Sequence, residues 1–126
     1  MADELKCVYK NRFGKNGEMI ARNFLTEKGM KFLKANYRYD RAEIDLIFED
    51  LKTGTVIFAE VKTRKNKKFG EPEESVNPSK QERIKKAAMG FILENESYSS
   101  HDLRIDVISI LFTEGVYEIN HIENAF

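Results

Sequence analysis

The sequence predicts an α/β (α+β) protein in which helices pack against a mixed β-sheet. Two observations favour this class: short runs of alternating apolar residues that form two hairpins, and two longer stretches with apolar residues at helical spacing. The length of 126 residues fits one domain over residues 1–126. The predicted order is helix, three strands, helix, two strands, which excludes an all-β or purely helical fold.

The first helix is predicted over about residues 16–28, where apolar residues recur on one stripe. Gly29 follows as the expected C-terminal stop. A strand over about residues 31–39 comes next, with the sequence KFLKANYRY. The residues expected to face inward from the helix are Ile20, Ala21, Phe24 and Leu25.

A β-hairpin is predicted from strand 43–50 and strand 55–62, joined by the loop 51–54. This loop length sets a register in which Ile47 lies opposite Phe58, so apolar residues match through the middle of the hairpin. A charged loop over residues 63–77 then leads away from it.

The second helix is predicted to begin at Pro78, because Asn77 can cap it and proline suits the first helical position. The segments LRIDVISILF and VYEINHIE that follow are typical of a second hairpin, which turns around residues 114–115. The chain is therefore predicted to contribute five strands to one sheet.

The first hairpin carries charges where apolar residues are expected. Its predicted register places Asp45 opposite Glu60 and Glu43 opposite Lys62. Carboxylates that face each other across two strands repel, and a divalent cation with oxygen ligands relieves that repulsion. Asp45, Glu60 and Lys62 thus form a candidate phosphodiester-cleaving centre, which Glu18 in the first turn of the first helix could complete as a further oxygen ligand.

A structural interpretation of the same charges stays open. Glu43 and Lys62 could form a cross-strand ion pair, and Glu60 could lie at a solvated end of the sheet. Glu18 fits the ordinary preference of acidic residues for helix N-termini.

Together these residues resemble the PD-(D/E)-x-K nuclease superfamily, and more closely the YraN family (also called UPF0102), whose members are predicted endonucleases similar to archaeal Holliday junction resolvases. The resemblance implies a restriction-endonuclease-like fold, a central mixed sheet flanked by helices. One departure is Ala42, where the family usually has glycine. The segments that carry the resemblance are GE (17–18), NYR (36–38), EIDLI (43–47), FAEVKTR (58–64), FG (69–70), RIDV (104–107) and NAF (124–126).

The resemblance implies a metal-dependent DNA endonuclease that hydrolyses phosphodiester bonds of branched or structured DNA, with Mg²⁺ (or Mn²⁺) as cofactor. It implies that Asp45, Glu60 and Glu18 are acidic residues of the metal site and that Lys62 is the catalytic lysine. The backbone carbonyl of Val61 would join the metal ligands, and the enzyme would act as a symmetric homodimer. The alternative is a non-catalytic module that keeps the nuclease fold for binding nucleic acid or docking a protein.

The charge distribution adds candidate phosphate contacts. The formal net charge is zero, with 21 basic and 21 acidic residues, so the total does not point to nucleic acid. Basic residues nevertheless cluster in KTRKNKK (62–68) and KQERIKK (80–86). For each of them the alternative is an exposed solubilising charge. The candidate nucleic-acid-binding residues are Arg38, Arg64, Lys65, Lys67, Lys68, Lys80, Gln81 and Arg83.

Other features favour a cytoplasmic protein without a membrane partner. Cys7 is the single cysteine, and no apolar stretch approaches the length of a membrane span or a signal peptide. A zinc site made of Cys and His is improbable, and His101 and His121 are expected to have no catalytic role.

Overall fold

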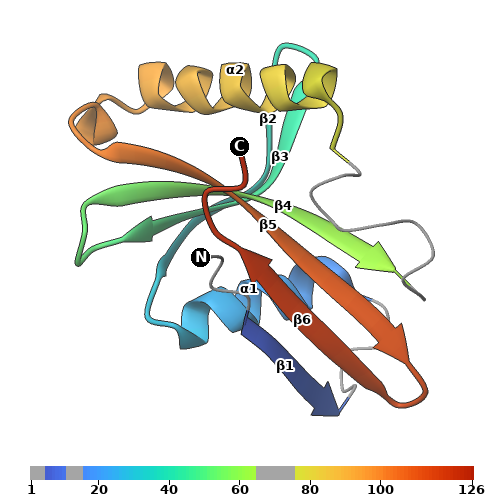
Figure 1. The fold of residues 1–126 in the computed structure, drawn as a ribbon. Coiled ribbons are helices and arrows are strands. Elements are labelled where there is room, and N and C mark those ends of the chain that lie inside the picture. Colours follow the sequence, from blue (N-terminus) through green and yellow to red (C-terminus); the bar gives the residue numbers. More distant parts are fainter. Residues whose placement is uncertain (1–4, 11–15, 65–75) are drawn as a thin grey trace.

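The computed structural model describes residues 5–10, 16–64 and 76–126. The predicted class is confirmed: a mixed sheet lies between α1 and α2, which cover opposite faces (Figure 1). The elements are β1 (Leu5–Lys10), α1 (Gly17–Glu27), β2 (Lys31–Tyr39), β3 (Ala42–Asp50), β4 (Thr55–Arg64), α2 (Pro78–Glu94), the 3-10 helix η2 (Glu96–Tyr98), β5 (Asp102–Thr113) and β6 (Val116–Ile122).

The six strands lie in the order β1-β6-β5-β4-β3-β2. β4 and β5 are parallel, because the chain crosses over through α2 between them, and the other neighbours are antiparallel. The predicted register of the first hairpin is confirmed at Ile47 opposite Phe58, and the same ladder pairs Asp50 with Thr55. Gly54 closes the turn with a positive φ of 66°, a conformation that glycine adopts without a steric penalty.

Each helix buries one stripe against the sheet. On one face Ile20, Ala21, Phe24 and Leu25 of α1 pack against strand residues such as Leu46 and Ile108. On the other face Ile84, Ala87, Ala88 and Phe91 of α2 pack against residues such as Ile47 and Phe58. The central strands are therefore covered on both sides.

The helix ends follow the predicted signals. The Asn16 side chain accepts a hydrogen bond from the backbone N–H of Met19 at 3.1 Å and so caps α1. Gly29 follows α1 with a φ of 91°, as expected of a helix stop. Asn77 caps α2 by accepting from the N–H of Lys80 at 2.8 Å, and Pro78 is the first helical residue.

The structure adds one strand that the sequence reasoning did not identify. β1 pairs antiparallel with β6 at the edge of the sheet. β4 also runs two residues beyond its predicted end, to Arg64, so the predicted loop is shorter at its start, and residues 65–75 of that loop lie outside the described residues. No helix in the described segments is long and apolar enough to cross a membrane.

A buried polar network joins β5 to the end of the chain. Asp106 is fully buried and accepts two hydrogen bonds from Arg104, both at 2.9 Å, and one from the N–H of Asn124 at 3.0 Å. His121 Nε2 lies 2.7 Å from the same carboxylate, while Lys28 Nζ lies 2.8 Å from His121 Nδ1. Because an ammonium group only donates, Nδ1 must accept and Nε2 must donate to Asp106.

The pKa of Asp106 reflects this network. Burial favours the neutral acid, but the hydrogen bonds from His121, Arg104 and the Asn124 N–H outweigh it and hold the pKa below its ordinary value. The ionised carboxylate is therefore the form that stabilises the fold, and both histidines have structural partners, since His101 Nε2 lies 2.8 Å from Glu49.

Asp106→Asn is expected to lower the free energy of unfolding at pH 7 by about 3 kcal/mol, because it removes one partner of a buried ion pair. A lowered pKa contributes stability that is present above the ordinary value and is lost as the pH falls through the lowered one. The difference in the free energy of unfolding between wild type and Asp106→Asn should therefore become smaller below about pH 4. Urea unfolding measures both effects, with the exposed Asp102→Asn on β5 as control. A cost equal to that of the control would contradict this account.

Candidate functional site

The strands β3 and β4 stop pairing next to the predicted acidic residues. Their last paired residues are Leu46 and Ala59, so the predicted cross-strand pair of Asp45 with Glu60 is not part of the ladder. Instead, the Asp45 carboxylate accepts a hydrogen bond from the Val61 N–H at 2.8 Å. Buried backbone N–H groups need a partner, and here a side chain supplies what the diverging strand does not.

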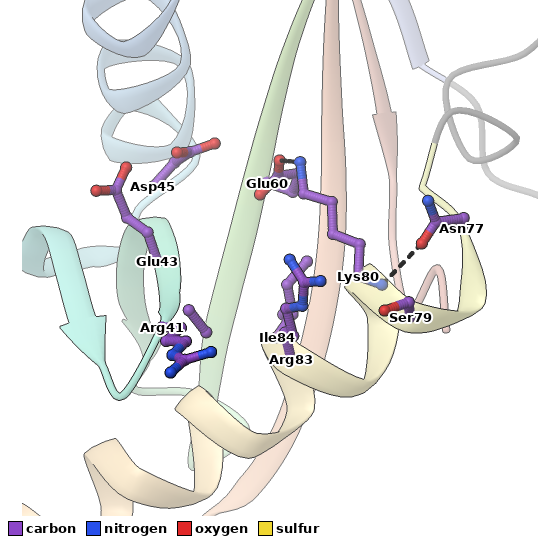
Figure 2. Close-up of a pocket in the computed structure, with 10 residues that line it drawn as sticks. Arg41, Glu43, Asp45, Glu60, Asn77, Ser79, Lys80, Arg83 and Ile84 are labelled. Atoms are coloured by element: carbon purple, nitrogen blue, oxygen red, sulfur yellow. Dashed lines mark hydrogen bonds and ion pairs between the residues drawn. The ribbon is translucent and has the colours of Figure 1, made fainter.

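A cavity of about 390 Å³ opens at this divergence, between the hairpin and the start of α2 (Figure 2). Asp45 borders it from β3 and Glu60 from β4, while Lys80 reaches in from the first turn of α2. The two predicted carboxylates thus face one cavity. The residues that line it are Arg41, Ala42, Glu43, Asp45, Glu60, Asn77, Ser79, Lys80, Arg83 and Ile84.

Two lysines neutralise Glu60, which is 7% exposed. Lys80 Nζ lies 2.7 Å from Glu60 Oε1, and Lys62 Nζ lies 3.6 Å from the same oxygen. The predicted proximity of Glu60 and Lys62 on one strand is confirmed. Lys80, predicted as a phosphate contact, is the nearer of these two lysines to Glu60.

Asp45 has a less favourable environment. Burial, the negative charge of Glu60 and smaller effects of Glu18 and Glu43 raise its pKa from 3.8 to about 7, against the opposing hydrogen bond from Val61. The ionised form of Asp45 is therefore destabilised at neutral pH. A cation bound in the cavity would stabilise it.

The pKa values of Lys62 and Lys80 are shifted in opposite directions. Burial and the adjacent positive charge of Lys80 lower the pKa of Lys62, although Glu60 opposes this. Burial also disfavours the charged form of Lys80, but its contact with Glu60 outweighs burial and raises the pKa. Pairs whose environments move their pKa values apart are typical of acid–base centres.

The donor set fits a hard divalent cation. Asp45 and Glu60 are oxygen ligands beside one polar cavity, and Mg²⁺ is commonly held by one or two carboxylates together with water. Within the described residues no group of three or more His, Cys, Asp or Glu side chains could hold a metal ion. Glu18 lies in the first turn of α1 and acts on Asp45 through its charge; its role as a ligand, like that of the Val61 carbonyl, stays a prediction.

The alternative ion pair between Glu43 and Lys62 does not form. Glu43 accepts from Arg38 at 3.0 Å on the exposed surface, so the predicted phosphate contact Arg38 has a carboxylate partner. Gln81, another predicted contact, donates to the Val76 carbonyl at 2.9 Å and fixes the entry to α2.

The remaining predicted phosphate contacts are placed as follows. Arg83 lines the cavity and Arg64 ends β4, while Lys65, Lys67 and Lys68 lie outside the described residues.

Sequence reasoning missed three polar residues of the cavity wall: Arg41, Ser79 and, beyond its capping role, Asn77. Arg41 lies in the turn between β2 and β3, and Ser79 lies in the first turn of α2. Among the described residues neither Arg41 nor Arg83 forms an ion pair. A basic residue two positions before the EID segment, in the turn that leads into that strand, is the signal that could have indicated Arg41.

The fold and the site define an α+β protein in which acidic and basic side chains from β3, β4 and α2 share one cavity beside a divergent strand pair. The chain belongs to the family described as Uncharacterised protein family UPF0102, whose family model matches residues 17–110. The matched segment contains Glu18, Asp45, Glu60, Lys62 and Lys80.

Curated relatives match over nearly the whole chain. A UPF0102 protein of Alkaliphilus oremlandii is 40% identical over 116 residues, which cover 91% of this chain and 97% of the relative. A UPF0102 protein of Caldicellulosiruptor bescii is 45% identical over 116 residues, which cover 90% and 95%. One from Syntrophomonas wolfei is 41% identical over 110 residues, which cover 87% and 93%.

Asp45→Asn is expected to stabilise the protein without metal at pH 8 and to change little at pH 5. Because folding raises the pKa of Asp45, its contribution to the free energy of unfolding is fully present below the ordinary pKa of 3.8. That contribution is lost as the pH rises through the raised pKa, near 7. The amide oxygen still accepts the Val61 N–H. Because the site is partly exposed, we expect a gain of about 1–2 kcal/mol at pH 8.

Thermal unfolding in EDTA at the two pH values measures this gain, with Asp102→Asn as control. A lower unfolding midpoint for Asp45→Asn than for wild type at pH 8 would show that the ionised Asp45 does not destabilise the folded protein.

Proposed function

We propose that this protein is a metal-dependent DNA endonuclease of the PD-(D/E)-x-K type with a restriction-endonuclease-like fold. The observation that carries the proposal is the cavity in which Asp45, Glu60 and Lys80 meet, with Lys62 on the same Glu60 oxygen. Phosphodiester hydrolysis needs oxygen ligands for a cation and positive charge near the phosphate, and these side chains supply both.

In this proposal Asp45 and Glu60 hold Mg²⁺ or Mn²⁺, with Glu18 and the Val61 carbonyl as further candidate ligands. When bound, the cation supplies a Lewis acid and an acidified water. Burial and the neighbouring Lys80 lower the pKa of Lys62. Lys62 therefore loses its proton more readily than an exposed lysine does. It can orient the attacking water or accept its proton.

The substrate contacts follow from the cavity wall. Arg83 and Arg41 border the cavity and have no ion-pair partner among the described residues, so both are available to phosphate oxygens. Such contacts position a backbone and carry little sequence information. We therefore propose salt-sensitive, weakly sequence-selective binding, and the resemblance extends this to branched DNA and a homodimer.

One observation favours the alternative, a non-catalytic module for binding nucleic acid or a protein. Without any metal, Glu60 already has two ammonium partners, and one Asp45 oxygen accepts a backbone N–H. A fold that had lost its cation could keep both carboxylates for these structural contacts.

Cleavage assays decide between the two functions. With Mg²⁺ or Mn²⁺, we expect wild type to cut junction or flap DNA, and we expect Asp45→Asn, Glu60→Gln and Lys62→Met each to lose at least about 100-fold in rate. Asp45→Asn is a better variant than Asp45→Ala, because alanine would also leave the Val61 N–H without its partner.

Lys86→Met and Asp102→Asn serve as controls, since both residues lie on the surface away from the cavity. Linear and single-stranded DNA are tested in parallel. Metal-dependent cleavage that survives the Asp45 and Lys62 substitutions would belong to a contaminant. Salt-sensitive DNA binding without any turnover would support the non-catalytic module instead.

A further inference from the structure

The start of α2 holds the Lys80 backbone in place. Asn77 accepts the Lys80 N–H at 2.8 Å, and Gln81 ties the preceding segment through the Val76 carbonyl. With its backbone fixed in this way, the side chain extends across the cavity to Glu60 on β4 (Figure 2).

The Lys80 ammonium group contacts a Glu60 oxygen that a metal ion could also bind. Its Nζ lies 2.7 Å from Glu60 Oε1, which is the distance of a charge-assisted hydrogen bond. A divalent cation that bound the same oxygen at about 2.1 Å would lie within a few ångström of this ammonium group. The repulsion between the two positive charges disfavours holding both on Glu60.

Lys80 is also able to leave. Its side chain is 39% exposed, whereas that of Lys62 is 25% exposed and lies farther from the same oxygen, at 3.6 Å. Arg83 lies three residues further along α2, so the two side chains project from neighbouring positions of one helix face and both line the cavity. A Lys80 that moved off Glu60 would stay beside Arg83, where the proposed phosphate backbone would pass.

We infer that Lys80 is an exchangeable counter-ion: it binds Glu60 while the cavity holds no divalent cation and is displaced when that cation binds. This inference rests on the proposed function, because it concerns the same carboxylates. It explains how the buried Glu60 carboxylate has a positively charged partner without a metal, and it makes Lys80 a competitor that weakens metal binding in the free protein.

Mn²⁺ binding by the full chain tests the inference without any need for activity. Isothermal titration calorimetry is carried out on wild type, Lys80→Met, Lys80→Arg and Lys86→Met. Lys80→Met keeps the aliphatic stem and removes the charge, and it is expected to bind Mn²⁺ about 10-fold more tightly, the effect of one lost charge-assisted hydrogen bond. Lys80→Arg keeps the competing charge and should bind no more tightly than wild type.

Two controls define the result. Lys86→Met removes a lysine of the same helix whose partner is Asp40, and its affinity should equal that of wild type. Glu60→Gln should weaken Mn²⁺ binding, which places the measured ion at this cavity. Thermal unfolding of each variant confirms that it is folded.

The outcomes separate this inference from the proposed function. Affinity that is unchanged or weaker in Lys80→Met, while Glu60→Gln loses binding, would overturn the counter-ion role and leave the proposed metal site intact. Absence of Mn²⁺ binding in every variant, Lys80→Met included, would overturn both.

Discussion

The site depends on the divergence of β3 from β4 after Leu46 and Ala59. Up to that pair the hairpin is an ordinary buried ladder, and beyond it the backbone of β4 loses its partner on that side. The Asp45 carboxylate bonds the Val61 N–H across the gap, so an acidic residue has a structural reason to lie inside the fold. The same gap forms the cavity that the start of α2 closes.

The charges in the cavity are unequally balanced. Glu60 has two ammonium neighbours, whereas Asp45 has other carboxylates near it and a pKa raised to about 7. A partly buried carboxylate without a positively charged partner is unfavourable for stability. Asp45 borders the cavity, and its ionised form has no ion-pair partner in the described part of the chain. This is the physical argument for a site that accepts a cation.

The fold could be predicted because its signals are local. Helix stripes, the Asn77 cap, the stop at Gly29 and the loop length of the first hairpin each depend on residues a few positions apart. The two carboxylates that border the cavity could be singled out for the same reason, since the predicted register follows from the loop. Strand β1 was missed because its identity depends on pairing with β6, more than a hundred residues away.

The contacts that give the site its character are long-range and could not be predicted. No local pattern indicates that Lys80 reaches Glu60, or that Asp45 bonds Val61 where the ladder ends. The network of Asp106 and His121 was also missed, although an aspartate inside the apolar run of RIDV was a visible signal. Side-chain reach across elements is set by tertiary packing, which local periodicity does not encode.

The most direct test of the central claim is a crystal structure of the protein soaked with Mn²⁺, with anomalous diffraction used to locate the ion. The account predicts an anomalous peak bound by carboxylate oxygens of Asp45 and Glu60, with the Lys80 ammonium moved away from Glu60. A fully soaked crystal without a peak between these two carboxylates, or with the ion bound elsewhere and Lys80 still on Glu60, would contradict it.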